Sequence, residues 1–223
     1  AYALQGALFA GLAVAGLLLP APPREGVGRV RAGLLSAYTQ VGPLRIAASF
    51  AVLVVMGLGL STVFPGWYAR QHGITVAAAA SLYAALNFTM IIGGLSTVAL
   101  LSRGVGARRL FRGLALLAGL AALGIFLPGL PVPVVLVALL VWLIVSGAAT
   151  AVVTSSLPRV VRDPAQGAAA AGLLSQVAAL TTFVTPQLWI GVLGLGAQAW
   201  QGFLLIIAVC WIAALRLLPV YDA

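Results

Sequence analysis

The side chains that could do chemistry in this sequence are few, uncharged and set within long apolar runs. The most polar of them is Asn87, an amide near the middle of the apolar run 76–101. Tyr83, Met90 and Gly94 share a helix face with it, at spacings of three and four residues. A buried amide in hydrocarbon is costly unless it is hydrogen-bonded. Asn87 therefore predicts either an interhelical hydrogen bond or the wall of a path for a polar solute.

Two further helix faces carry hydroxyl and aromatic groups. The faces hold Trp142, Ser146, Thr150 and Thr154 in the run 134–154, and Ser175, Ala178, Thr182, Thr185 and Trp189 in the run 167–192. Small hydroxyls in membrane helices often bond their own backbone or a neighbouring helix, so each has a structural alternative to substrate contact. The candidates for a substrate path are Asn87, Tyr83, Trp142, Ser146, Ser175, Gln176 and Thr182.

Acid–base and metal chemistry have almost no side chains to use here. Glu25, Asp163 and Asp222 are the only acidic residues, and all lie in loops or at the C-terminus. Intramembrane proton relays generally use Asp, Glu or His. Cys210, the only cysteine, permits neither an intrachain disulfide nor a cysteine metal cluster. We therefore expect no enzyme activity, no metal and no cofactor; the coupling residue of a proton symporter would have to lie elsewhere.

Composition identifies the class of protein. Of 223 residues, 63% are apolar and 7% are charged, and the mean hydropathy is +1.16. A soluble protein of this size could not bury so much apolar surface, so the chain is predicted to be an all-α membrane protein that crosses the bilayer several times. The net charge of +9 also suggests a nucleic-acid partner. We exclude one because the basic residues, all arginine, occupy short loops between apolar runs.

The apolar runs predict a helical bundle of seven transmembrane helices. They are residues 2–19, 44–64, 76–101, 110–127, 134–154, 167–192 and 200–218. This divides the chain into a first span (1–20), a basic linker (21–43), a six-helix unit (44–219) and a tail (220–223). Pro65 and Gly66 are expected to end the second span, with Trp67 and Tyr68 at the membrane interface. The chain begins without a methionine, and we expect it to be a fragment.

The arginines predict the orientation. All but Arg70 lie in loops on one side of the seven-span arrangement or near its C-terminus. Arginine-rich loops stay cytoplasmic, so the N-terminus is expected outside and the C-terminus in the cytoplasm of a plasma membrane, such as the bacterial inner membrane. Runs 2–19, 110–127 and 200–218 are almost free of polar residues and should face lipid.

The loop between the third and fourth spans carries the most specific motif. Its residues 100–109 read LLSRGVGARR. This stretch resembles the signature loop G-x-x-x-D-R-x-G-R-R of the major facilitator superfamily, with Ser102 in place of the acid. The matching residues are Ser102, Arg103, Gly106, Arg108 and Arg109. Seven spans that start outside and end inside are similar to the sixth through twelfth helices of that family, so the chain resembles its C-terminal half with one preceding helix.

This resemblance implies a secondary active transporter of a small solute that works by alternating access. The partners it implies are the lipid bilayer, the solute and an N-terminal half that completes the substrate site. A seven-helix receptor or sensor is the alternative, because it shares the N-out, C-in topology. A covalent retinal pigment is excluded, since its Schiff base needs a lysine and the sequence has none.

Overall fold

The computed structural model describes residues 38–161 and 164–218, and every element in these ranges is helical. The predicted span 2–19, the linker up to residue 37 and the tail 220–223 lie outside the described residues. The elements are α3 (Val41–His72), α4 (Val76–Asn87), α5 (Thr89–Ser102), α6 (Ala107–Phe126), α7 (Val132–Ser155), α8 (Leu157–Val160), α9 (Pro164–Leu193), the 3-10 helix η1 (Gly196–Gln198) and α10 (Ala199–Leu217).

Six helical segments in the described part of the chain are long and apolar enough to cross a membrane. They are Val41–His72, Val76–Ser102, Ala107–Phe126, Val132–Val160, Gln166–Leu193 and Gly196–Leu217. Each corresponds to one predicted span, which confirms an all-α architecture of multi-pass type for this region. The remaining predicted span, residues 2–19, lies outside the described residues.

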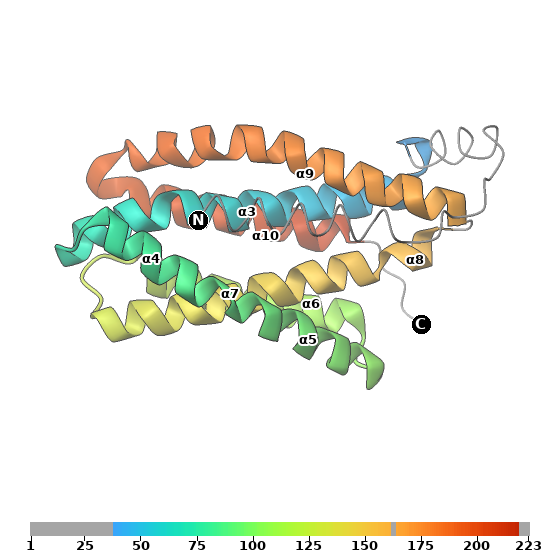
Figure 1. The fold of residues 1–223 in the computed structure, drawn as a ribbon, viewed down its shortest axis with the longest axis horizontal. Helices are drawn as coiled ribbons and strands as arrows, with labels where there is room; N and C mark the ends of the chain where they lie inside the picture. The colour runs from blue at the N-terminus through green and yellow to red at the C-terminus, as the bar shows by residue number, and fades with distance from the viewer. Residues whose placement is uncertain (1–37, 162–163, 219–223) are drawn as a thin grey trace, which may run out of the picture.

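Two helices, α3 and α7, form the centre of the bundle. Helix α3 packs against α9, α10, α4 and α7, while α7 packs against α5 on one side and α6 on the other. Figure 1 shows α9, α3 and α10 running alongside one another, with α7, α6 and α5 forming the lower group. Helices α6 and α10 also touch, which links the two groups at the back.

The predicted helix end at Pro65 is wrong, because α3 continues through this proline to His72. A proline is tolerated within a membrane helix when the rest of the bundle holds the segment in place. Here Trp67 and Tyr68 supply that hold, since both are buried in the bundle. The helix ends at Gly73, whose φ of 68° suits a glycine C-cap.

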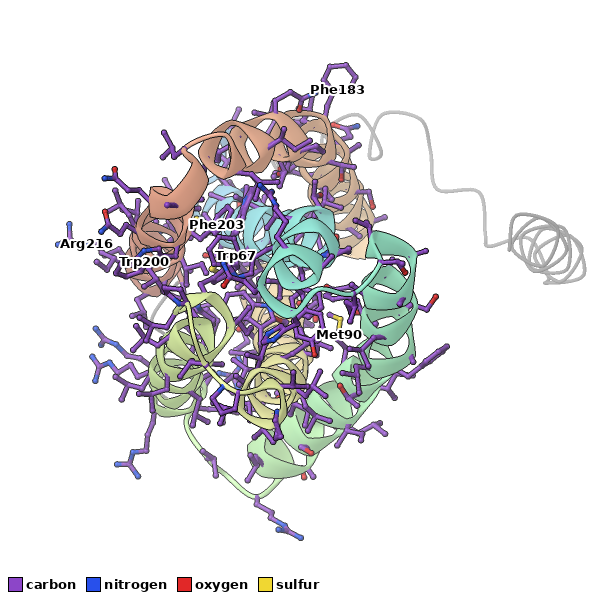
Figure 2. The ribbon with its side chains drawn as sticks, turned by 90° about the vertical axis from the view of Figure 1, so that its left-hand side faces the viewer. Trp67, Met90, Phe183, Trp200, Phe203 and Arg216 are labelled. Carbon is purple, nitrogen blue, oxygen red and sulfur yellow. The ribbon has the colours of Figure 1, made fainter. Side chains whose placement is uncertain are left out.

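The aromatic side chains of this end form one cluster. The Trp67 indole N–H donates to the Ile125 carbonyl oxygen over 3.3 Å, and its ring meets that of Phe203 edge-on at 5.8 Å. Figure 2 shows both labelled rings inside the bundle. Phe203 stacks in turn on Trp189, with 5.5 Å between ring centres. These contacts, all made by aromatic side chains, join α3 to α6 by a hydrogen bond and α3, α9 and α10 through rings.

Trp189 fits against α3 only because residue 59 is glycine. A Cβ added at Gly59 would lie 2.0 Å from two atoms of the Trp189 indole. Trp189 is fully buried. The α3–α9 contact therefore depends on an indole that occupies the space of a missing side chain.

Helices α5 and α7 meet backbone to backbone. A Cβ at Gly93 would lie 1.8 Å from the Ile144 carbonyl oxygen, and one at Gly147 would lie 2.0 Å from the Met90 carbonyl oxygen. The buried Thr97 hydroxyl donates across the same interface to the Ala148 carbonyl oxygen over 3.3 Å. Small residues allow this close approach, which gains van der Waals contact and an interhelical hydrogen bond.

The third span is interrupted, which the sequence analysis did not predict. Helix α4 ends at Asn87 and α5 begins at Thr89, with Phe88 between them. The Thr89 hydroxyl donates to the Leu86 carbonyl oxygen over 2.7 Å. This side-chain hydrogen bond lies at the point where the regular helix is interrupted.

One end of the bundle, here called the arginine-rich end, carries seven of the eight arginines in the described ranges. They are Arg45, Arg103, Arg108, Arg109, Arg112, Arg159 and Arg216, and Arg70 alone lies at the other end. Arg45 belongs to α3 and is bound to α10: its Nε donates to the Leu217 carbonyl oxygen over 3.2 Å and its Nη2 to the Arg216 carbonyl oxygen over 2.8 Å. A cation at a helix C-terminus is favourable, so this contact fastens α3 to α10.

The expected burial pattern differs in one respect. Helix α6, predicted to be peripheral, has more of its length buried than α4–α5 or α9. It is covered because it packs on both α7 and α10. Helices α9 and α4–α5 instead have one side that no described element covers.

Closing the α5–α7 interface with a methyl group should destabilise the protein. We expect Gly93→Ala and Gly147→Ala each to lower the free energy of unfolding by about 1–3 kcal/mol, the usual range for overpacking, measured by denaturant titration in detergent micelles. Gly119→Ala in α6 is the control, because a Cβ there has nothing within 4 Å. Equal stability of all three variants would contradict the packing described.

Labelling of introduced cysteines should reveal the orientation. In a Cys210→Ala background, Ser102→Cys marks the arginine-rich end and Pro128→Cys marks the α6–α7 turn at the other end. Because arginine-rich loops stay in the cytoplasm, a membrane-impermeant maleimide should label position 128 in intact cells and position 102 only after permeabilisation. The reverse pattern would show the opposite orientation.

Candidate functional site

A cavity of about 150 Å³ lies between α3, α5, α7 and α10. It is lined by Phe50, Leu53, Val54, Met56, Gly57, Met90, Trp142, Ser146, Thr150 and Trp211. Spacings of three and four residues place the α3 members on one side of that helix, and a spacing of four does the same for the α7 members. Gly57 contributes no side chain and leaves open space beside it.

The cavity reaches from the buried interior to a partly exposed surface. Trp142 and Trp211 are only 2% and 6% exposed, whereas Ser146, Thr150 and Met90 are partly exposed. Figure 2 shows the Met90 side chain directed from α5 toward the middle of the bundle. A solute could therefore enter from the side of the bundle and reach groups that are otherwise sealed from solvent.

The hydroxyls of Ser146 and Thr150, which line the cavity, have no hydrogen-bond partner among the described residues. Most hydroxyls of the described spans instead donate to a carbonyl oxygen three or four residues earlier in their own helix. These are Ser61, Thr62, Thr89, Ser102, Thr154, Ser155, Ser156, Ser175, Thr181, Thr182 and Thr185. The hydroxyls at the cavity are therefore free to bind something else.

Both cavity tryptophans carry a buried donor that is also unpaired. The Nε1 atoms of Trp142 and Trp211 have no partner in the described part of the chain. A buried N–H without an acceptor costs about 1–3 kcal/mol. Trp189 and Ser49 are unpaired as well, but they do not line this cavity. Two tryptophans with unpaired indole donors and two residues with unpaired hydroxyls thus line one cavity in the described part of the chain.

The predicted residues of α9 do not belong to the cavity. The Ser175 hydroxyl donates to the Ala171 carbonyl oxygen over 3.2 Å, and that of Thr182 to the Ala178 carbonyl oxygen over 2.8 Å. Gln176 accepts a hydrogen bond from the Tyr38 hydroxyl, which ties the segment before α3 to α9. All three side chains are exposed in this chain.

Of the predicted face on the third span, only Met90 lines the cavity. Tyr83 packs against the ring of Phe64 on α3, at 5.7 Å between centres. Asn87 is exposed at the end of α4 and makes no hydrogen bond within the described ranges. Of the two alternatives predicted for this amide, the interhelical hydrogen bond is therefore not formed within the described ranges.

Trp142 and Ser146 are the predicted path residues that the structure brings together, and Thr150 completes their row on α7. Trp211 and Phe50 were missed. Trp211 lies in an apolar run with no polar neighbour to single it out. Only the packing of α10 in the bundle shows that this residue lines the cavity. A search for aromatic residues with a polar atom, placed in otherwise bare spans, could have found it.

The arginine loop forms a turn between α5 and α6. Ser102 donates to the Ala99 carbonyl oxygen over 2.9 Å, and Gly106 is the N-cap of α6. Arg103, Arg108 and Arg109 are exposed. The described ranges contain no acidic residue to pair with them, and no metal-binding group of His, Cys, Asp or Glu.

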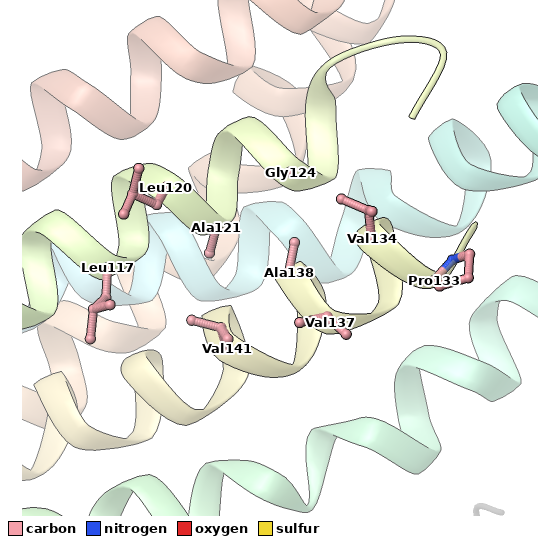
Figure 3. A pocket seen from close by; sticks show the side chains of 9 residues that line it. All are labelled: Leu117, Leu120, Ala121, Gly124, Pro133, Val134, Val137, Ala138 and Val141. Carbon is pink, nitrogen blue, oxygen red and sulfur yellow. The ribbon is translucent and has the colours of Figure 1, made fainter. Parts of the chain in front are cut away.

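A groove of about 500 Å³ lies between α6 and α7. All nine residues that line it are apolar, and Figure 3 shows Leu120, Ala121 and Val137 among them. A groove with no polar side chain cannot orient a polar solute. We therefore regard it as part of the lipid-facing surface.

No protein-family model matches this sequence, and no curated protein is similar enough to identify a relative. The site is therefore judged on its own chemistry.

Removing a free hydroxyl should not reduce stability. Thr150→Val is expected to leave the free energy of unfolding unchanged or slightly raised, because the lost hydroxyl has no partner among the described residues. The same substitution at Thr97 removes the bond to Ala148 and should cost about 0.6–1.7 kcal/mol. Denaturant titration of both variants compares them directly. A clear loss in Thr150→Val would show that its hydroxyl serves the fold.

Proposed function

We propose that this chain is the C-terminal half of a secondary active transporter that carries a small solute by alternating access. The observation that supports this most is the cavity with unpaired polar groups on α7 and α10. Unpaired hydroxyl and indole groups inside a membrane bundle are costly unless water or a solute binds them. A role in binding a solute explains why the cavity contains unpaired hydroxyl and indole groups.

The depth of the cavity fits this role. Trp142 lies near the middle of α7, and Gly57 lies near the middle of α3. Transporters bind their substrates near the midplane of the bilayer, at the interface between two repeated units. A cavity at this level is reachable from either side of the membrane after a modest movement of the helices.

The uncovered sides of α9 and α4–α5 are where we place the second half of the transporter. The two segments are not packed against each other, and α3 lies between them. Their exposed residues include the amide of Asn87 and the hydroxyls of Ser175 and Thr182. A facing half would bury these groups and close the open side of the cavity, which accounts for path candidates that no described helix covers.

The remaining assignments follow from the same proposal. The excess of arginine at one end supports a plasma-membrane protein with its C-terminus in the cytoplasm. The partners are the lipid bilayer, the solute and the N-terminal half. The chain acts as a carrier rather than an enzyme, and the solute site uses hydrogen bonds and apolar contact without a cofactor.

Sided accessibility of the cavity tests the proposal and separates it from a receptor. The full-length protein, with Cys210→Ala, would carry Ser146→Cys and be labelled with a charged, membrane-impermeant thiol reagent in right-side-out and inverted vesicles. A carrier exposes the cavity to each side in turn, so labelling is expected in both preparations. A receptor exposes its site to one side, so one-sided labelling would contradict transport.

Leu116→Cys is the matched control for this experiment. Leu116 is 73% exposed on α6 and faces the surroundings of the bundle. A thiol in lipid stays protonated and therefore unreactive, so this variant should remain unlabelled in both preparations. Absence of labelling at position 146 from either side would also contradict the proposal.

A further inference from the structure

The cavity lining specifies the kind of solute more closely than the fold does. Indole N–H groups only donate hydrogen bonds, and hydroxyls donate or accept. The lining contains two of each, from Trp142, Trp211, Ser146 and Thr150, and no carboxylate, amide or guanidinium. The rest of the lining is aliphatic, thioether or phenyl. A ligand that matches it has an apolar body and presents acceptors to α7 and α10.

A charged ligand would lack the partners that it needs. A cation finds no acidic side chain in this lining. An anion would have at most four donors on a mostly apolar wall, since the backbone N–H groups around it are used within the helices. The arginine nearest along α3, Arg45, is already bound to the C-terminal carbonyls of α10.

We propose that the cavity binds an uncharged small molecule with an apolar body and hydrogen-bond acceptors such as carbonyl oxygens. Trp142 and Trp211 donate to those acceptors, and the hydroxyls of Ser146 and Thr150 complete the contacts. Phe50 and Met90 pack against the apolar body. This assignment rests on the proposed function, because it takes the same cavity as the solute site and defines its chemistry.

Three probes that share one ring and differ in charge test the assignment. Benzamide is neutral, benzoate is an anion and benzylammonium is a cation at pH 7. Binding of each to the full-length protein in lipid nanodiscs would be measured by ligand-observed NMR titration. Benzamide is expected to bind, and Trp142→Phe, which keeps an aromatic ring but removes the N–H, should weaken it about five-fold, the effect of one lost hydrogen bond.

Trp200→Phe is the control for loss of an indole elsewhere. Trp200 is half-buried at the start of α10 and does not line the cavity. Benzamide binding should be unchanged in this variant. Ser146→Ala provides a second cavity variant that removes one hydroxyl and little volume, and it should also weaken benzamide.

The outcomes separate the two proposals. Benzoate or benzylammonium binding that equals benzamide binding and depends on Trp142 would overturn the neutral-solute assignment while leaving the cavity as the solute site. Benzamide binding that is the same in Trp142→Phe, Ser146→Ala and the unaltered protein would overturn the assignment itself. The two-sided labelling at position 146 would then decide separately whether the transporter proposal also fails.

Discussion

The need to pair every polar group inside hydrocarbon shapes most of this structure. Water is absent from a bilayer core, so an unpaired hydroxyl or N–H keeps its full desolvation cost. Most hydroxyls of the described spans meet this need within one helical turn, as Thr62 does with the Leu58 carbonyl oxygen. Thr97 meets it across an interface instead. The cavity beside α7 departs from this rule on several adjacent groups, which is what makes it the site of interest.

The same constraint governs the helix packing. Lipid is as apolar as a leucine side chain, so helices gain little from burying apolar surface against each other. Close contact has to come from small residues, and Gly93 with Gly147 provides it between α5 and α7. At the arginine-rich end, the guanidinium of Arg45 supplies donors to α10 carbonyls that lie at a helix terminus. Close packing at glycines and hydrogen bonds at helix ends thus hold these helices together, as burial of apolar surface does in a soluble protein.

Much of the fold was predictable from the sequence because a bilayer sets a minimum helix length. The six spans in the described residues match the apolar runs, with ends shifted by a few residues in most cases. The largest error was at Pro65, where the local rule that proline ends a helix gave way to the burial of Trp67 and Tyr68. The break at Phe88 escaped prediction because no glycine or proline marks it.

The site was predictable in part. Helical spacing correctly put Trp142, Ser146 and Thr150 on one face. Spacing could not tell which hydroxyls bond their own helix, so Ser175 and Thr182 looked equivalent to Ser146 until the hydrogen bonds were known. Nor could it show that Trp211, from a distant and apolar helix, meets α7 across the bundle. Pairing between helices is a tertiary property, and the periodicity of one helix does not contain it.

The contact between Gly59 and Trp189 limits how this protein can evolve. No residue with a side chain fits at position 59 while the indole occupies its place. A smaller residue at 189 alone would leave a void beside Phe203 and Phe126, whose rings rest on the indole. Neither position can change freely by a single step, so the two should vary together among related sequences. Such covariation would record the α3–α9 contact in sequences for which no structure is known.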